Sequence, residues 1–126
     1  MPEPVLADTS VWVDHLRKGN AELVSLLNAG VVWSHAFVIG ELACGNLTRR
    51  AAVLGSLAEL PRVSPADHHQ VLDMVEGNKL MGRGLGWIDM HLLVAAAHSG
   101  LKLWSLDKRL AAAAEALHGA GRLGAR

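Results

Sequence analysis

The feature that most constrains the fold is a short apolar run near the N-terminus that ends directly on an acidic residue. Val5, Leu6 and Ala7 are followed by Asp8 and Thr9, and a helical pattern begins at once. An apolar run of this kind is typical of a strand buried on both faces of a parallel sheet. An Asp at the carboxyl end of such a strand lies where open α/β sheets place their ligand sites. Because its charge is costly to bury without a partner, we expect a metal ion beside Asp8.

Composition excludes several classes of protein. The 126 residues suffice for one domain with a real core, so we expect a single domain over 1–126. Twelve basic residues balance twelve acidic ones, so attraction to nucleic acid would need a local patch of charge. Cys44 is the only cysteine, which excludes an internal disulfide and a cysteine-based zinc site. Neither a signal peptide nor a membrane-spanning stretch is visible, and we expect a soluble, cytoplasmic protein.

Apolar runs and helical patterns alternate along the rest of the chain. Further strands are expected at 31–33 and 101–105, with weaker ones at 62–63 and 121–124. Helices are expected over 10–18, 21–28, 34–45, 48–60, 64–81, 88–99 and 107–118. This alternation predicts an α/β fold in which helices flank a parallel sheet.

Small polar residues mark the expected helix starts. Ser10, Ser34 and Ser64 are candidate N-caps, and Thr48 or Asn46 would cap the helix over 48–60. A flexible loop precedes the helix over 88–99, and its glycines occupy alternate positions, Gly82, Gly84 and Gly86. No Gly-Lys-Ser or Gly-Lys-Thr follows, so the loop is not predicted to be a nucleotide-binding P-loop.

Four acidic residues stand apart from the others by their surroundings. Asp8 and Asp107 each follow an expected strand, and the carboxyl ends of parallel strands meet at one edge of a sheet. Glu41 lies among apolar and small residues, and Asp89 opens a strongly apolar helix, where the helix dipole favours a negative charge. A cluster of these acids would repel itself unless a cation neutralised it. Oxygen ligands without Cys, and without His at ligand spacing, favour Mg²⁺ or Mn²⁺ over Zn²⁺.

Each acid also has a simpler explanation. Asp8 would serve as a cap for the following helix, and Asp107 as a turn or cap residue. Glu41 would be an exposed helix residue, and Asp89 an ordinary acid of a first helical turn. A site is therefore indicated only because all four occur at matched places. A Mg²⁺ ion held by such carboxylates suits phosphodiester hydrolysis.

Other polar and aromatic residues are weaker candidates. The seven histidines are best explained as neutral surface residues. Among the cations, the better candidates for phosphate contacts lie close to the acids in sequence: Arg83, Lys108 and Arg109. Trp87, beside the glycine loop, is the one tryptophan expected to be available for base stacking, while Trp12, Trp33 and Trp104 are expected in the core.

Four segments together resemble PIN-domain proteins, specifically the VapC-type toxin ribonucleases of type II toxin–antitoxin pairs. The segments occur in the family's order and approximate spacing, and they are 6–14 (LADTSVWVD), 40–45 (GELACG), 88–93 (IDMHLL) and 103–110 (LWSLDKRL). The resemblance implies a three-layer α/β/α sandwich with a central parallel sheet. It also implies metal-dependent cleavage of RNA by an endoribonuclease.

The resemblance also assigns roles to residues of this chain. The family's four acids fall on Asp8, Glu41, Asp89 and Asp107. Mg²⁺, or Mn²⁺, would be held chiefly by Asp8, Asp89 and Asp107, and Glu41 would complete the site or orient the attacking water. The resemblance likewise implies an RNA substrate, a homodimer and a cognate VapB-type antitoxin.

Two supporting residues follow from the same resemblance. Thr9 would hold a water molecule or the Asp8 carboxylate. Ser105 stands where the family often has Thr, two residues before the last acid.

Two rival interpretations remain open at this stage. A metal-dependent phosphatase also gathers acids at strand ends, but it would need an Asp-x-Asp pair, and the residue two after Asp8 is Ser10. A non-catalytic RNA- or partner-binding module on the same fold is the second. Against it, an unused cluster of carboxylates would only destabilise the domain by mutual repulsion.

Overall fold

The computed structural model describes the backbone of residues 2–124 and the side chains of residues 2–118. Its sheet has three parallel strands, β1 (Val5–Ala7), β2 (Val32–Trp33) and β3 (Lys102–Trp104), in the order β2-β1-β3. Because β1 is central and covered on both faces, all three of its residues are buried. A single parallel bridge between Ser34 and Arg62 extends the β2 edge, so the strand expected at 62–63 is reduced to that bridge.

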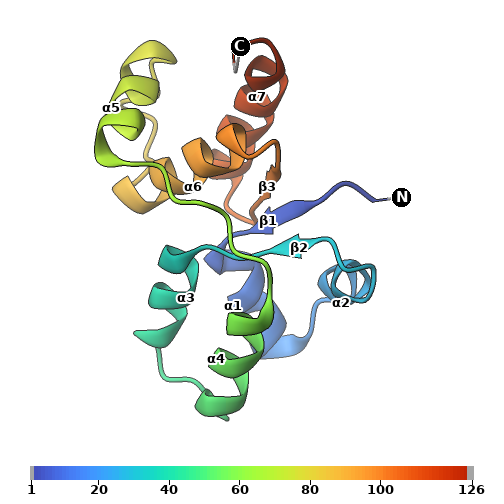
Figure 1. The fold of residues 1–126 in the computed structure, drawn as a ribbon. Coiled ribbons are helices and arrows are strands. Elements are labelled where there is room, and N and C mark those ends of the chain that lie inside the picture. The colour runs from blue at the N-terminus through green and yellow to red at the C-terminus, as the bar shows by residue number, and fades with distance from the viewer. Residues whose placement is uncertain (1, 125–126) are drawn as a thin grey trace.

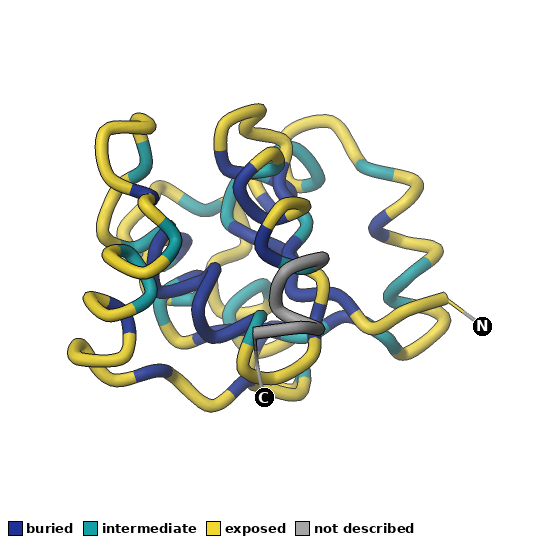
Figure 2. The backbone as a smooth tube through the Cα atoms, turned by 90° about the horizontal axis from the view of Figure 1, so that it is seen from above, coloured by how far each residue is buried: buried dark blue, intermediate teal, exposed yellow. Residues whose placement is uncertain are grey.

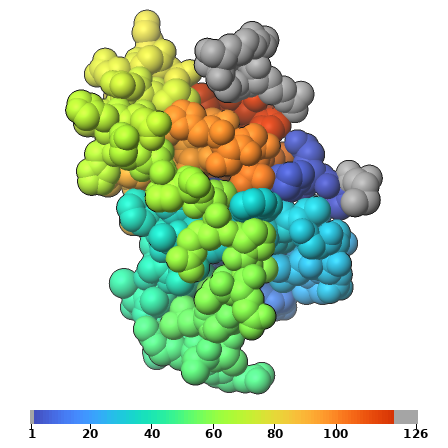
Figure 3. All heavy atoms as spheres, viewed as in Figure 1, coloured from blue at the N-terminus to red at the C-terminus, as the bar shows by residue number. Residues whose placement is uncertain are grey.

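Helices cover both faces of the sheet. On one side lie α1 (Thr9–Lys18), α2 (Ala21–Asn28), α3 (Ala36–Ala43) and α4 (Arg50–Glu59). On the other lie α5 (His68–Gly77), α6 (Trp87–His98) and α7 (Lys108–Gly124) (Figure 1). The predicted three-layer α/β/α sandwich is therefore confirmed. Residues 60–67 carry the chain from one helical layer to the other across the front of the molecule (Figure 3).

The core lies between the sheet and the helices that pack against it. Buried backbone runs through the centre of the molecule and exposed backbone around its rim (Figure 2). Seven successive residues of α6, from Met90 to Ala96, are all buried, and a helix that is apolar on every side belongs in the interior. Leu6 of β1 and Val11 of α1 are completely inaccessible to solvent. Because α6 is held so firmly, its first turn and Asp89 have a fixed position.

Several helix starts differ from the expected ones because another residue supplies the cap. Asp8, two residues before Ser10, caps α1, and the ring of His35 rather than Ser34 caps α3. At α4 neither Thr48 nor Asn46 is the cap. That helix begins instead after Arg49, whose φ of 55° is left-handed and uncommon for a residue other than glycine.

Helices α5 and α7 also differ from their predicted limits. Asp67, rather than Ser64, opens α5 through a capping box with Gln70, and α5 ends at Gly77, four residues before the predicted end. The strand expected at 121–124 is wrong, because these residues continue α7 as far as Gly124. A glycine inside a helix costs only about 1 kcal/mol relative to alanine, so glycines alone do not end one.

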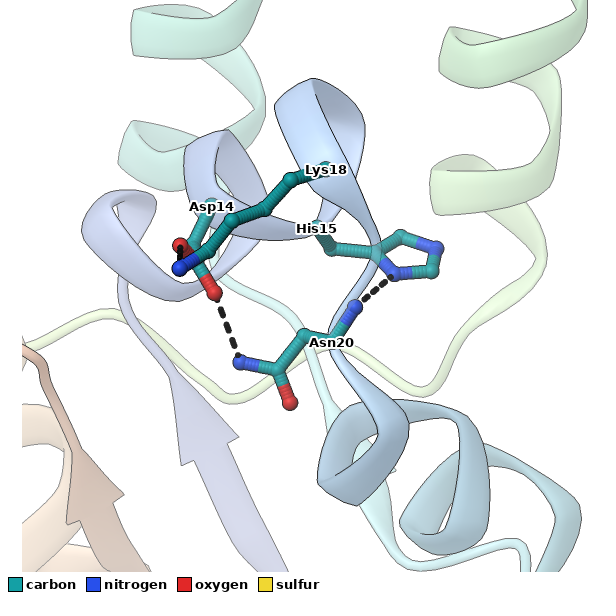
Figure 4. A network of polar contacts seen from close by, with 4 residues as sticks. All are labelled: Asp14, His15, Lys18 and Asn20. Atoms are coloured by element: carbon teal, nitrogen blue, oxygen red, sulfur yellow. Dashed lines mark hydrogen bonds and ion pairs between the residues drawn. The ribbon is translucent and has the colours of Figure 1, made fainter.

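A small polar network fixes the angle between α1 and α2 (Figure 4). The N–H of Asn20 donates to Nδ1 of His15 at 3.1 Å, and its side-chain amide donates to Asp14 at 3.1 Å. The side-chain oxygen of Asn20 accepts from the N–H of Leu23 and so caps α2. Lys18 lies 3.5 Å from the other oxygen of Asp14.

A cavity of about 570 Å³ lies beside this network, between α1, α2 and α4. Its lining is largely apolar and includes Trp12, Leu16, Leu27, Val53 and Leu57, and none of the four acids lines it. Within residues 2–124 no helix is both long and apolar enough to cross a membrane.

Candidate active site

Asp8 is the most enclosed acid of the molecule. It directly follows β1, and only 5% of its surface is exposed. One carboxylate oxygen accepts hydrogen bonds from the N–H and the hydroxyl of Ser10, and the other accepts from the hydroxyl of Ser105 at 2.9 Å. Burial raises the pKa of Asp8 above its ordinary value, and these hydrogen bonds oppose that rise. The carboxylate is thus held in one orientation at a place where its charge is costly.

The two serines are themselves oriented by backbone groups. The hydroxyl oxygen of Ser10 accepts from the N–H of Leu106 at 2.9 Å, and that of Ser105 accepts from the N–H of Asp107 at 3.0 Å. Because each hydroxyl already accepts from a backbone donor, its own hydrogen is directed toward Asp8. The carboxyl ends of β1 and β3 are therefore joined by one hydrogen-bonded network, and Asp107 belongs to it.

Glu41 reaches the same region from α3. It is exposed, and its Oε1 accepts a 2.5 Å hydrogen bond from the hydroxyl of Thr9, the residue after Asp8. The family resemblance implied that Thr9 holds Asp8 or a water molecule; in the structure its hydroxyl donates to Glu41. This contact attaches the helix that carries Glu41 to the first turn of α1.

Asp89 and Asp107 both occupy helix starts. Oδ2 of Asp89 accepts from the N–H of Gly86 at 2.9 Å, in the first turn of α6. Oδ1 of Asp107 accepts from the N–H groups of Arg109 and Leu110 at 2.9 and 3.1 Å, and it caps α7. The simpler roles considered for these acids are therefore real, and each role uses only one carboxylate oxygen. Among the described residues, the other oxygen of each has no hydrogen-bond donor.

The four acids are chemically suited to bind a hard divalent cation, but their side chains do not converge on one point in this structure. Carboxylate oxygens are the ligands that Mg²⁺ and Mn²⁺ prefer, and buried Asp8 lacks any cationic partner among the described residues. However, no three acidic, histidine or cysteine side chains of the described part of the chain lie close enough together to hold one ion. Hydrogen bonds link Asp8 to Asp107 through Ser105, while none links Asp89 to either of them.

Comparison with known proteins identifies this arrangement. The family model described as "PIN domain" matches residues 5–116, which include all four acids. The chain belongs to the PIN domain family. It is also similar to proteins called Ribonuclease VapC32 from two strains of Mycobacterium tuberculosis, CDC 1551 / Oshkosh and ATCC 25618 / H37Rv. Each is 46% identical over 110 residues, which cover 86% of this chain and 89% of the relative. These matches make it a VapC-type PIN-domain protein.

Three cations lie close in sequence to the acids of this PIN domain. Arg83, Lys108 and Arg109 are all exposed. The side chain of Arg109 also lies against Gly84 of the loop before α6. No sequence pattern distinguished Arg109 from its two neighbours, since the contact joins positions 25 residues apart.

The prediction of surface histidines is wrong for two of the seven. His35 and His91 are buried, and burial lowers the pKa of both imidazoles. His35 uses Nδ1 to cap α3, whereas neither ring nitrogen of His91 has a partner among the described residues. The ring of His91 packs against Phe37 and His68, and against Trp87, which remains 42% exposed. Aromatic packing between α3, α5 and α6 explains this burial.

Sequence reasoning missed one residue of the Asp8 network. The sequence indicates only a capping role for Ser10, although an Asp followed two positions later by Ser often forms a local hydrogen bond. In this PIN domain that local bond is extended to Leu106, so Ser10 also links α1 to the segment after β3.

Proposed function

We propose that this VapC-type PIN domain is an endoribonuclease, the toxin of a type II toxin–antitoxin pair, and that it requires a divalent cation. The observation that carries the proposal is the environment of Asp8. A buried carboxylate whose pKa is raised, yet which is oriented by two serines, is unfavourable to folding unless a cation compensates it. The name of the Mycobacterium tuberculosis relatives supports RNA cleavage as the reaction.

In this proposal each acid has a distinct task. Asp8, Asp89 and Asp107 hold Mg²⁺, or Mn²⁺, through carboxylate oxygens. A bound divalent ion supplies a lowered pKa for an attacking water molecule and offsets charge on the phosphate oxygens. Glu41, fixed by Thr9, orients the water, while Ser10 and Ser105 keep Asp8 in its orientation. Arg83, Lys108 and Arg109 contact the RNA backbone.

A non-catalytic RNA- or partner-binding module remains the alternative, and one observation favours it. Asp89 and Asp107 already serve as helix-start residues, and no three acids of the described residues converge on a point. A phosphatase with an aspartyl intermediate has no such support. The second acid that such a phosphatase needs, two residues after Asp8, is replaced by Ser10.

We further propose the setting in which the enzyme works. The protein would act in the cytoplasm as a homodimer of a single domain over 1–126, and a VapB-type antitoxin would inhibit it. The support for this setting is the similarity to VapC proteins.

The test is RNA cleavage by the purified protein with Mg²⁺, with Mn²⁺ and with EDTA, beside the variant Asp8→Asn. Asp14→Asn is the matched control, because it makes the same change six residues away, in the network between α1 and α2. We expect metal-dependent cleavage that Asp8→Asn reduces by at least about a hundredfold and Asp14→Asn leaves unchanged. Equal cleavage by wild type and Asp8→Asn would refute the mechanism. RNA binding without cleavage under any condition would favour the binding module.

A further inference from the structure

The exposed side chain of Arg109 lies directly against the backbone at Gly84. A Cβ atom added at Gly84 would overlap Nη1 of Arg109 and lie 3.1 and 3.2 Å from its Cδ and Cζ atoms. The φ of Gly84 is +77°, a conformation that side chains rarely adopt. The backbone of the glycine loop and the arginine side chain are therefore in direct contact, with no room for a side chain between them.

This contact spans the two halves of the candidate active site. The N–H of Arg109 donates to Asp107, so the base of the arginine is attached to one acid. Gly84 lies two residues before Gly86, whose N–H donates to Asp89, so the end of the arginine lies on the loop that holds the other acid. Arg109 therefore connects the residue that caps α7 with the loop that precedes α6, and it forms an ion pair with neither acid.

The charge of Arg109 is left uncompensated. Among the described side chains, the ion pairs are those of Lys18 with Asp14 and His118 with Glu3, and Arg109 takes part in neither. The guanidinium packs on Gly84 and has no side-chain hydrogen bond in the described part of the chain. An exposed planar cation whose donors have no partner in the described protein is suited to an anion with two or more oxygens, such as a phosphodiester.

We propose that Gly84 seats Arg109 as the phosphate-binding residue of the active site, so that it positions the RNA backbone beside Asp89 and Asp107. The proposal rests on the proposed ribonuclease function and adds a residue that positions the substrate. It singles out Arg109, among the three cations proposed to contact RNA, by its contact with Gly84.

The loop contains its own control for the backbone conformation. Gly82 has a φ of +74°, close to that of Gly84, but a Cβ atom there would meet nothing within 4 Å. Gly82→Ala therefore introduces the same backbone strain as Gly84→Ala without displacing Arg109. Lys102→Ala is the control for charge, because Lys102 is exposed at the opposite, amino end of β3.

The first experiment measures binding of a labelled, single-stranded oligoribonucleotide of mixed sequence in EDTA, where no metal-dependent cleavage occurs, across a range of salt concentrations. We expect Arg109→Ala to weaken binding about tenfold or more. The slope of log Kd against log salt should fall by about 0.7, the value for one phosphate contact on a single strand. Gly84→Ala should weaken binding similarly, while Gly82→Ala and Lys102→Ala stay within about twofold of wild type.

A double variant then tests whether Gly84 acts through Arg109. If it does, Gly84→Ala adds no loss of binding in a protein that already carries Arg109→Ala, beyond what Gly82→Ala adds there. Arg109→Lys should restore the salt slope but not the full affinity, because an ammonium group lacks the planar fork. Thermal unfolding of each variant shows whether it is folded before binding is measured.

The outcomes separate this proposal from the proposed function. If wild type cleaves RNA while Arg109→Ala binds with unchanged affinity and salt slope, Arg109 is not the phosphate-binding residue and only this inference fails. The inference about Gly84 and Arg109 also fails, while the ribonuclease proposal stands, if wild type cleaves RNA and Gly84→Ala binds RNA as tightly as Gly82→Ala does. If wild type neither binds nor cleaves RNA, the ribonuclease proposal fails and this inference fails with it.

Discussion

Ser105 donates a hydrogen bond of 2.9 Å to Oδ2 of Asp8, a residue 97 positions earlier in the chain. The same hydroxyl accepts from the N–H of Asp107, so it joins two acids of the site. Its effect on Asp8 is to favour the ionised carboxylate, against the rise in pKa that burial causes. Ser105 therefore orients the Asp8 carboxylate where β1 and β3 end side by side, and we propose that it positions Asp8 for the reaction.

Replacing Ser105 tests this role. We expect Ser105→Ala to lower kcat/KM for RNA cleavage about tenfold, because Asp8 loses one of its two serine donors and the freedom of its carboxylate increases. Ser105→Thr keeps the hydroxyl and should retain most of the activity. The measurement is kcat and KM for both variants at saturating Mg²⁺. Equal losses in the two variants would indicate that packing, not the hydroxyl, matters at this position.

The charge of Asp8 also predicts how stability depends on pH. Since folding raises the pKa of this carboxyl above 3.8, the folded protein binds its proton more readily than the unfolded chain does. The free energy of unfolding therefore falls as pH rises from 3.8 through the raised pKa, and the loss persists at neutral pH. Asp8→Asn removes the charge and should be at least as stable as wild type at neutral pH.

The measurement is denaturant unfolding of wild type and Asp8→Asn at neutral and acidic pH without divalent metal. The advantage of Asp8→Asn should shrink as the pH falls through the raised pKa toward 3.8, because the carboxyl of the folded wild-type protein becomes protonated in that range. A variant that is several kcal/mol less stable than wild type at neutral pH would contradict the view that the ionised carboxylate burdens the fold.

The sheet was predictable because its strands are short apolar runs with a strong burial requirement. Val5, Leu6 and Ala7 cannot avoid the interior, and a chain that alternates such runs with helices has few other arrangements. The acid at the end of the central strand was found for the same reason. The helix limits were less predictable, because Asp8 and Ser10 are both good caps and only the tertiary partner of Ser10, the N–H of Leu106, decides between them.

Contacts between distant residues were beyond the reach of sequence patterns. Histidine is a polar residue, and nothing in the sequence indicates that His91 is buried. Its burial is explained by the rings of Phe37, His68 and Trp87, which pack around it in the folded protein. The contact of Arg109 depends likewise on the loop of Gly84, which no local spacing relates to α7. Sequence patterns could therefore nominate candidate residues for a site, whereas the contacts of those residues had to come from the structure.

His35 gives a second prediction for pH, of opposite sign to that of Asp8. Burial, and secondly electrostatic repulsion from His91 and Arg62, lowers the pKa of its imidazole below 6.5. The neutral ring is the folded form, so its contribution to stability is fully present above pH 6.5 and is lost as the pH falls through the lowered pKa. His35→Asn keeps an acceptor that can cap α3 but does not titrate.

The measurement compares the free energy of unfolding of wild type and His35→Asn between neutral pH and about pH 5. The variant has a lower stability at neutral pH, because a smaller side chain leaves space in the core. Its stability should nevertheless fall less steeply with acid than that of wild type. Parallel pH profiles for the two proteins would show that His35 does not contribute to the dependence.

Asn20 provides a prediction that separates stability from activity. Its side chain caps α2 through Leu23 and donates to Asp14, at a junction whose cavity-facing residues include none of the four acids. We expect Asn20→Ala to cost about 1–2 kcal/mol of unfolding free energy, the usual value for a lost N-cap, and Asn20→Ser to cost less because it keeps a capping oxygen. Asn28→Ala, an exposed change at the other end of the same helix, is the matched control and should cost about 0.5 kcal/mol or less. RNA cleavage by the folded fraction of all three variants should equal that of wild type. A lower kcat for fully folded Asn20→Ala would instead show that the α1–α2 junction is coupled to the acids.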